Sequence, residues 1–263
     1  NVHKFYDYWG NRTGYFTVAK THQELIIDSR LIMNSTHKII EENLSIVANW
    51  NLIQQLVSND ILLCDYSLKE NIKQQTTIEK IIEELAFANK SPLQAVKDAS
   101  EYIFNNYKYV KGITTIETTV DEIIELKSGV CQDFAHLLLQ ILRTQKIPAR
   151  YVSGYICPNK NGMRGEGATH AWVDAYIPNL GWIGIDPTNN CFANENHIQL
   201  AVGRHFTDCT PIKGTFKGPA NQELSVYVSV GYEDGSVFED ENMVQLYKEI
   251  NEGVPIIQNQ QQQ

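Results

Sequence analysis

Residues 129–155, GVCQDFAHLLLQILRTQKIPARYVSGY, contain two different hydrophobic periods that together decide the fold. From Phe134 the apolar residues recur at offsets of 0, 3, 4, 7 and 8, the single stripe of a helix that faces a core. Pro148 ends that helix, because a proline disfavours helical geometry in the residue before it. The period then changes to two, which indicates a strand. The stretch therefore predicts a helix packed on a sheet.

The same two-residue alternation appears repeatedly after Pro148. A turn at Pro178-Asn179 separates two of these segments and predicts a hairpin. Strands are expected at 149–157, 170–177, 182–186, 204–209 and 223–232. The fold class is therefore α+β, with helices over about 76–146 packed on an antiparallel sheet over 148–232 and a mainly β segment in front.

Local signals before residue 129 predict where three helices begin. Ser91 is an N-cap candidate with proline at the first helical position, and Thr119 precedes a short acidic helix. Thr76 and Glu79 have the spacing of a capping box, which predicts a helix start at Thr76. Upstream, turn glycines and β-branched residues predict strands between residues 1 and 36, including the apolar run 25–33.

Composition excludes several classes of function. The chain has 263 residues, 22 basic and 31 acidic side chains, and a formal charge of −9 without a basic block, which argues against nucleic-acid binding. Its apolar runs are far shorter than the ~20 residues of a membrane-spanning helix. The five cysteines are odd in number and contain no C-x-x-C pair, so we expect neither a disulfide framework nor a zinc ribbon. A reducing, cytoplasmic location is predicted.

Cys131 is the candidate nucleophile. It begins the strongest predicted helix, where unsatisfied backbone N–H groups and the helix dipole favour a thiolate and could also hold an oxyanion. A thiol nucleophile needs a base, and His170 begins a predicted strand after a glycine-rich loop at 158–169. A third group must orient the imidazole, and Asp186 ends the following strand.

Hairpin geometry tests whether Asp186 lies beside His170. A three-residue loop closed by Tyr176 and Leu180 makes opposed residue numbers sum to 356, which places the two residues directly opposite each other. A loop two residues longer places them diagonally on one face, within ~7 to 8 Å. A one-residue slip places them on opposite faces.

Four sequence stretches resemble the bacterial transglutaminase-like proteins of the papain-like cysteine-enzyme superfamily. They are Gly-Val-Cys-Gln-Asp-Phe-Ala-His at 129–136, Ile-Pro-Ala-Arg-Tyr-Val-Ser-Gly-Tyr at 147–155, Thr-His-Ala-Trp-Val at 169–173 and Gly-Trp-Ile-Gly-Ile-Asp-Pro-Thr-Asn-Asn at 181–190. The similarity continues through His197-Ile198 and 200–204. Tyr6–Asn11 resembles the end of the β-domain that often precedes this core.

The resemblance implies a papain-like transglutaminase core with a catalytic triad of Cys131, His170 and Asp186. It implies acyl transfer through a thioester, either peptide or isopeptide hydrolysis or transglutamination, on a peptide or protein amide substrate. Residues 61–263 would form the catalytic domain, and 1–60 an N-terminal β segment that lacks its first strands. No cofactor, metal, nucleic acid or membrane is expected, and the oligomeric state is left open.

The same residues allow other interpretations. A tyrosine upstream of the cysteine, Tyr107 or Tyr109, could supply an oxyanion donor. Of the two, Tyr109 is the candidate. His136 could pair with Cys131 at a metal, but the spacing is unusual and packing beneath the site is favoured. The other four cysteines are read as structural. Rival functions are a non-catalytic peptide- or glycan-binding module and a cell-wall peptide amidase.

Overall fold

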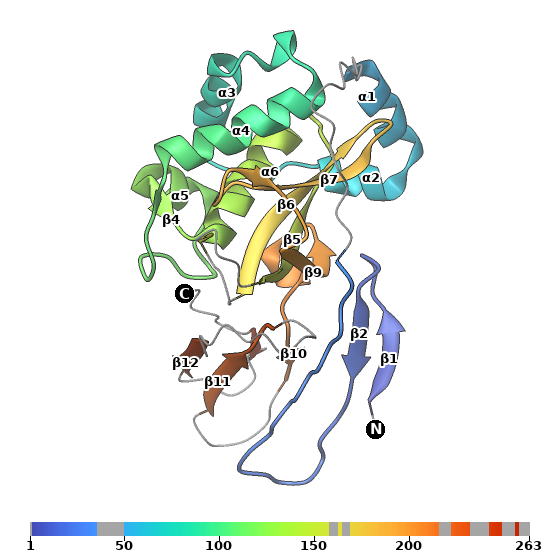
Figure 1. Ribbon diagram of the computed structural model, residues 1–263, viewed down its shortest axis with the longest axis vertical. Coiled ribbons are helices and arrows are strands. Elements are labelled where there is room, and N and C mark those ends of the chain that lie inside the picture. Colours follow the sequence, from blue (N-terminus) through green and yellow to red (C-terminus); the bar gives the residue numbers. More distant parts are fainter. Residues whose placement is uncertain are drawn as a thin grey trace.

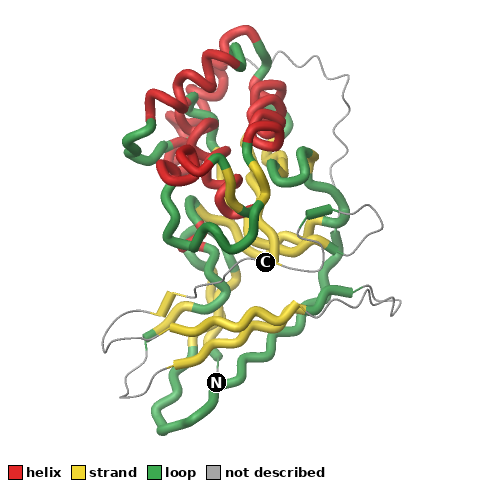
Figure 2. Tube along the Cα trace, turned by 90° about the vertical axis from the view of Figure 1, so that its left-hand side faces the viewer, coloured by secondary structure: helices red, strands yellow, loops and turns green. Residues whose placement is uncertain are grey.

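The structure is a computed structural model that describes residues 2–35, 50–157, 163–164, 169–215, 222–231, 242–248 and 256–257. Most of the glycine-rich loop at 158–169 lies outside the described residues. Within the described ranges, no helix combines the length and the apolar character needed to cross a lipid bilayer. Helices gather at one end of the molecule and strands at the other (Figures 1 and 2).

A five-stranded antiparallel sheet forms the centre, in the order β8-β7-β6-β5-β9. The predicted strands at 149–157, 170–177 and 182–186 are all confirmed within a residue. Along the central strand β6 consecutive residues are buried, so both of its faces are covered rather than one. The bounds are β5 Ala149–Ile156, β6 Thr169–Ile177, β7 Gly181–Asp186, β8 Cys191–Phe192 and β9 His197–Gly203.

Helix α6, Cys131–Thr144, packs on this sheet and is surrounded by the other helices (Figure 1). Its residues are buried from Cys131 through Arg143, so the whole circumference of the helix is covered and not the apolar stripe alone. Buried Arg143 donates to the carbonyl oxygens of Tyr66 and Ala149 at 2.8–3.1 Å, which satisfies its polar atoms. The surrounding helices are α1 Trp50–Asn59, α2 Ile61–Ser67, α3 Gln75–Glu84, α4 Pro92–Asn106 and α5 Val120–Leu126.

Two of the three predicted helix starts are confirmed. The Ser91 hydroxyl accepts the N–H of Gln94, and Thr119 exchanges hydrogen bonds with Glu122. The third helix is confirmed as α3, but its predicted capping box at Thr76 is absent, because α3 begins at Gln75 with Gln74 as the N-cap. There the carboxylate of Asp121, on α5, accepts the backbone N–H groups at positions 73 and 74. A long-range acceptor thus replaces the local cap.

In the described part of the N-terminal segment, the strands form a single hairpin, from β1 His3–Tyr6 and β2 Arg12–Tyr15. The strand expected at 25–33 is wrong: this run has no ladder partner within the described residues, and its apolar side chains are exposed. Helix α1 also lies within the segment expected to be β, and its Ile53 joins the helical core. Asn11 joins the hairpin to β9 through two hydrogen bonds to the backbone of Val202, at 2.7 and 2.8 Å.

The region after β9 differs from the predicted strand at 204–209. Residues Phe206–Asp208 form a short 3-10 helix, η2. The Asp208 carboxylate accepts the backbone N–H groups of Arg204 and His205, and this local turn replaces a ladder. The strand expected at 223–232 is confirmed as β11 Gln222–Val228, paired with β12 Asn242–Lys248. Short pairs complete the described strands: β3 Lys108–Tyr109, β4 Ser128–Gly129, β10 Lys213–Gly214 and β13 Ile256–Ile257.

Candidate active site

Cys131 is the first residue of α6, as the sequence predicts. The helix start is held by Asp133, whose Oδ2 accepts the Val130 N–H at 2.8 Å and the Thr114 hydroxyl at 2.6 Å. A Cβ at Gly129 would lie 2.5 Å from that same oxygen, so only glycine fits before this turn. The thiol is therefore placed at the positive end of a rigid, buried helix.

His170 and Asp186 come from the β6–β7 hairpin. Ile177 pairs with Gly181, so opposed residue numbers sum to 358 rather than 356. The prediction that the two residues are directly opposite is therefore wrong by two residues, because the turn is centred on Asn179, which has a φ of 68°. The shift preserves parity, and both side chains remain on one face. The Nε2 of His170 lies 2.8 Å from Oδ2 of Asp186.

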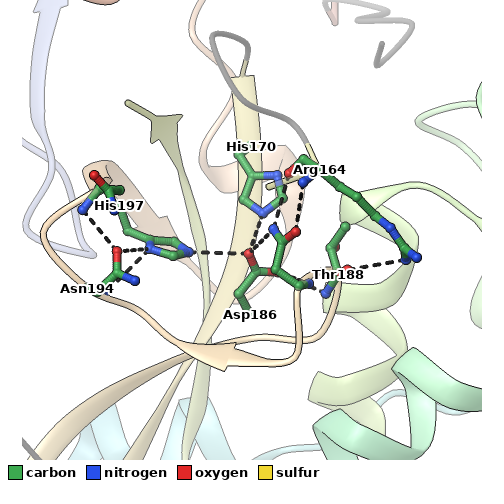
Figure 3. Close-up of polar contacts among 8 residues, drawn as sticks. Arg164, His170, Asp186, Thr188, Asn194 and His197 are labelled. Carbon is green, nitrogen blue, oxygen red and sulfur yellow. Dashed lines mark hydrogen bonds and ion pairs between the residues drawn. The ribbon is translucent and has the colours of Figure 1, made fainter. Parts of the chain in front are cut away.

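The Asp186 carboxylate is fully buried and accepts five N–H groups. Oδ1 accepts the backbone N–H groups of Thr188 and Asn189 at 2.8 and 3.3 Å. Oδ2 faces both His170 and His197, and the Asn189 amide donates to it at 2.7 Å (Figure 3). Burial alone would raise the pKa of Asp186, but the two histidines lower it well below its usual range. The group is a fixed anion.

Cys131 is the second neighbour that acts on the His170 ring. Burial disfavours the charged imidazole, but Asp186 and then Cys131 outweigh it and raise the pKa of His170 to about 10. Because Nε2 faces Asp186, Nδ1 is the nitrogen left for the thiol. Nδ1 makes no hydrogen bond of standard geometry to a described residue. The structure thus brings Cys131, His170 and Asp186 together.

Tyr109 also lies beside this group. Strand β3 pairs Tyr109 with Gly129, two residues before the cysteine. Burial, and next the neighbouring Cys131, raise the pKa of Tyr109, so its hydroxyl keeps its proton and remains a donor. The guanidinium of Arg164 lies 5.7 Å from the centroid of the Tyr109 ring, and the backbone N–H of Arg164 donates to the Asn189 side-chain oxygen. This geometry favours Tyr109 over Tyr107 as the donor.

The remaining sequence candidates are placed elsewhere. His136 stacks on His205 at 4.1 Å and accepts the N–H of Phe206, so it packs in the core away from the triad. All five cysteines are free. Burial raises the pKa of three of the other thiols, Cys157, Cys191 and Cys209.

One group of possible metal ligands includes a triad residue. Atoms of Asp186, Cys191 and His197 lie within 4.8 Å of one another. A metal needs free carboxylate lone pairs and a thiolate. Here five N–H groups already occupy the carboxylate, and burial, with the charge of Asp186, raises the pKa of Cys191 to about 12. The arrangement therefore favours a hydrogen-bond network over a metal centre.

The sequence analysis did not predict three residues that hydrogen-bond to the Asp186 carboxylate, namely Thr188, Asn189 and His197. A signal existed for each. The first two follow Asp186 in the stretch at 181–190, and His197 begins the stretch that continues the resemblance. The side chain of His197 is 1% exposed, and only the sheet brings it to the triad carboxylate.

A cysteine, a histidine and an aspartate therefore define this site, and the comparisons assign the chain to a family. Residues 79–187, which contain Cys131, His170 and Asp186, match the transglutaminase-like superfamily. An uncharacterised protein of Mycobacterium leprae is 31% identical over 237 residues, or 87% of this chain and 81% of that protein. The chain belongs to the transglutaminase-like superfamily.

Two further relatives have more specific descriptions. A protein-glutamine gamma-glutamyltransferase of Pseudomonas aeruginosa is 32% identical over 117 residues, 41% of this chain and 17% of that protein. The structure of a candidate cysteine protease from Cytophaga hutchinsonii has a TM-score of 0.50 at 27% identity. That match covers 58% of this chain and half of the other, and it shares the papain-like transglutaminase core.

Proposed function

We propose that the protein is a cysteine-dependent acyltransferase that opens amide bonds through a thioester on Cys131. The observation that supports the proposal is the buried pair in which Asp186 holds Nε2 of His170 at 2.8 Å, with Cys131 near enough to raise the pKa of the same imidazole. An imidazole held in this way has its tautomer set, since the carboxylate can only accept a hydrogen bond.

The chemistry follows from where the protons lie. The Cys131 sulfur attacks the amide carbonyl carbon, a C–S bond forms, and the C–N bond breaks. The thiol proton passes through Nδ1 of His170 to the leaving amine. Water or a second amine then attacks the thioester, gives its proton to the same nitrogen and releases the thiol. Water yields hydrolysis, whereas an amine yields a new amide bond.

The oxyanion formed in both steps needs donors. Backbone N–H groups at the start of α6 face the site, and the Tyr109 hydroxyl is a second donor beside the cysteine. Donors of this kind stabilise a charge that develops only in the transition state, so they act on the rate more than on binding.

Acylation of Cys131 tests the proposal directly. The protein would be incubated with a glutamine-containing peptide, a lysine isopeptide and a cell-wall peptide, and peptide mapping would locate the retained acyl group. Cys131→Ala removes the nucleophile, and Cys64→Ala is the matched control. Added hydroxylamine or lysine separates amine transfer from hydrolysis.

We expect an acyl group on Cys131 with at least one substrate class, and the mass of the adduct names that class. Binding of a peptide or glycan without acylation would instead support a non-catalytic module. Acylation by the cell-wall peptide alone would support the amidase alternative. The location of the protein remains a prediction from cysteine usage.

A further inference from the structure

Asp186 lies between two imidazole rings rather than beside one. His170 approaches Oδ2 from β6 at 2.8 Å, and His197, the first residue of β9, approaches the same oxygen at 3.2 Å (Figure 3). Strands β7 and β9 are separated in the sheet by β6 and β5. The second ring is therefore brought to the carboxylate by the tertiary fold and not by the hairpin that joins His170 to Asp186.

The His197 ring is fixed from its far side as well. Nδ1 lies 3.2 Å from the backbone N of Asn194 and 3.1 Å from Oδ1 of the same residue. That amide oxygen in turn accepts the N–H of Asn196, and Trp172 packs edge-on against the ring at 5.2 Å. With 1% of the side chain exposed, the imidazole has no room to turn away.

The polarity of the contact with Asp186 follows from the chemistry of the two groups. An ionised carboxylate only accepts hydrogen bonds, so Nε2 of His197 must carry a proton. Asn194 suits either form of the ring, because its N–H can donate to a bare Nδ1 and its Oδ1 can accept from a protonated one. In both cases His197 donates to the oxygen that orients His170.

We propose that His197 is a positioning residue, a second imidazole that holds the Asp186 carboxylate in the orientation needed to align His170. This inference rests on the proposed function, since it assigns His197 a part in the same relay. The hydrogen bonds of the His197 ring go to Asp186 and Asn194. It acts through Asp186, whose pKa it helps to keep low.

Two variants separate hydrogen bonding from packing. In His197→Gln the side-chain amide nitrogen reaches about as far as Nε2, whereas His197→Asn has the same amide one methylene shorter. A hydrogen bond to a charged group is worth enough to change a rate about tenfold or more. We expect His197→Asn to lower kcat by at least this factor with little change in KM, and His197→Gln to keep clearly more of kcat. Urea unfolding of both variants reports stability separately.

A double-mutant cycle tests whether the effect passes through Asp186. If His197 acts on that carboxylate, His197→Asn should cost little further rate in an Asp186→Ala background. An equal loss in both backgrounds would overturn the proposal. So would an equal loss of kcat in the glutamine and asparagine variants, or no loss in either.

Alkylation of Cys131 by iodoacetamide provides a readout that needs no substrate. Because alkylation depends on the imidazole beside the thiol, its rate constant should fall in the same order, wild type, His197→Gln, His197→Asn. If the wild type alkylates rapidly but transfers no acyl group, the proposed function fails while this order still holds. If turnover is intact and His197→Asn changes neither measurement, the inference about His197 fails alone.

Discussion

Replacing Asp186 by asparagine perturbs the site with almost no change in shape. The carboxylate has two acceptor oxygens that receive five N–H groups, and an amide has only one. With the amide oxygen directed at His170 and His197, the new NH₂ faces the backbone N–H groups of Thr188 and Asn189. With the opposite orientation, three N–H groups lose their acceptor instead.

The favourable orientation therefore leaves two buried donors unpaired, at about 1–3 kcal/mol each, or roughly 2–6 kcal/mol of unfolding free energy. For a chain of this size, Tm falls by roughly 2–4 °C per kcal/mol. The kcat should fall by about 10⁴-fold, because the imidazole loses both its orienting anion and its preferred tautomer. KM should change little.

The pH dependence of stability gives a second, independent signature. The pKa of His170 is raised from 6.5 to about 10. The pair with Asp186 therefore stabilises the wild type fully below about pH 6.5, and this contribution is lost as the pH rises toward 10. Without the anion, burial dominates at His170 and favours the neutral ring. The loss of stability between these pH values should therefore disappear in Asp186→Asn.

Steady-state kinetics and urea unfolding between pH 6 and 10 measure both effects, with a circular dichroism spectrum to confirm folding. A variant that keeps kcat within tenfold of the wild type would show that another group orients His170. An unchanged pH profile of stability would show that the pair does not carry the linkage assigned to it.

Three further predictions follow from the geometry of the thiol. Cys131→Ala should abolish acyl transfer while circular dichroism shows intact folding, since only a small side chain is removed, and comparable turnover would refute the nucleophile assignment. Limited iodoacetamide at pH 6 should label Cys131 before the more exposed Cys64 and Cys191. This preference should shrink in His170→Ala and in denaturant. Equal labelling by peptide mapping would mark Cys131 as an ordinary thiol. Tyr109→Phe should lower kcat by about 10²-fold at unchanged Tm if the hydroxyl holds the oxyanion, whereas an unaffected kcat would leave that role to the backbone.

Local sequence signals predicted elements whose determinants lie within one turn of the chain. Ser91 and Thr119 cap their helices because each hydroxyl reaches an N–H three residues ahead. Thr76 has the same spacing to Glu79, yet α3 begins earlier, since Asp121 from another helix accepts the N–H groups there. Local patterns predict well only where no distant group competes for the same backbone atoms.

The β6–β7 hairpin shows what the two-residue hydrophobic period can predict and what it cannot. Alternation predicted that His170 and Asp186 share a face, and the observed register shift of two residues preserves this, whereas a one-residue slip would have separated them. The register itself depended on the turn, where Asn179 adopts a φ of 68° and Gly181 one of 75°. The apolar stripe of α6 likewise predicted a helix but not its complete burial, which results from the helices and the sheet that enclose it.

By itself, the sequence determined the periods of the main helix and strands, because these depend on residue type and short spacing, and its motifs indicated the three residues of the candidate triad through their resemblance to a known family. Only the tertiary structure decided that His197 would meet the carboxylate of Asp186, since His197 begins a strand that β6 and β5 separate from β7. It also decided that the carboxylate would be buried among five N–H groups. Such convergence depends on contacts between distant segments, and no local pattern encodes which polar groups will share one buried anion.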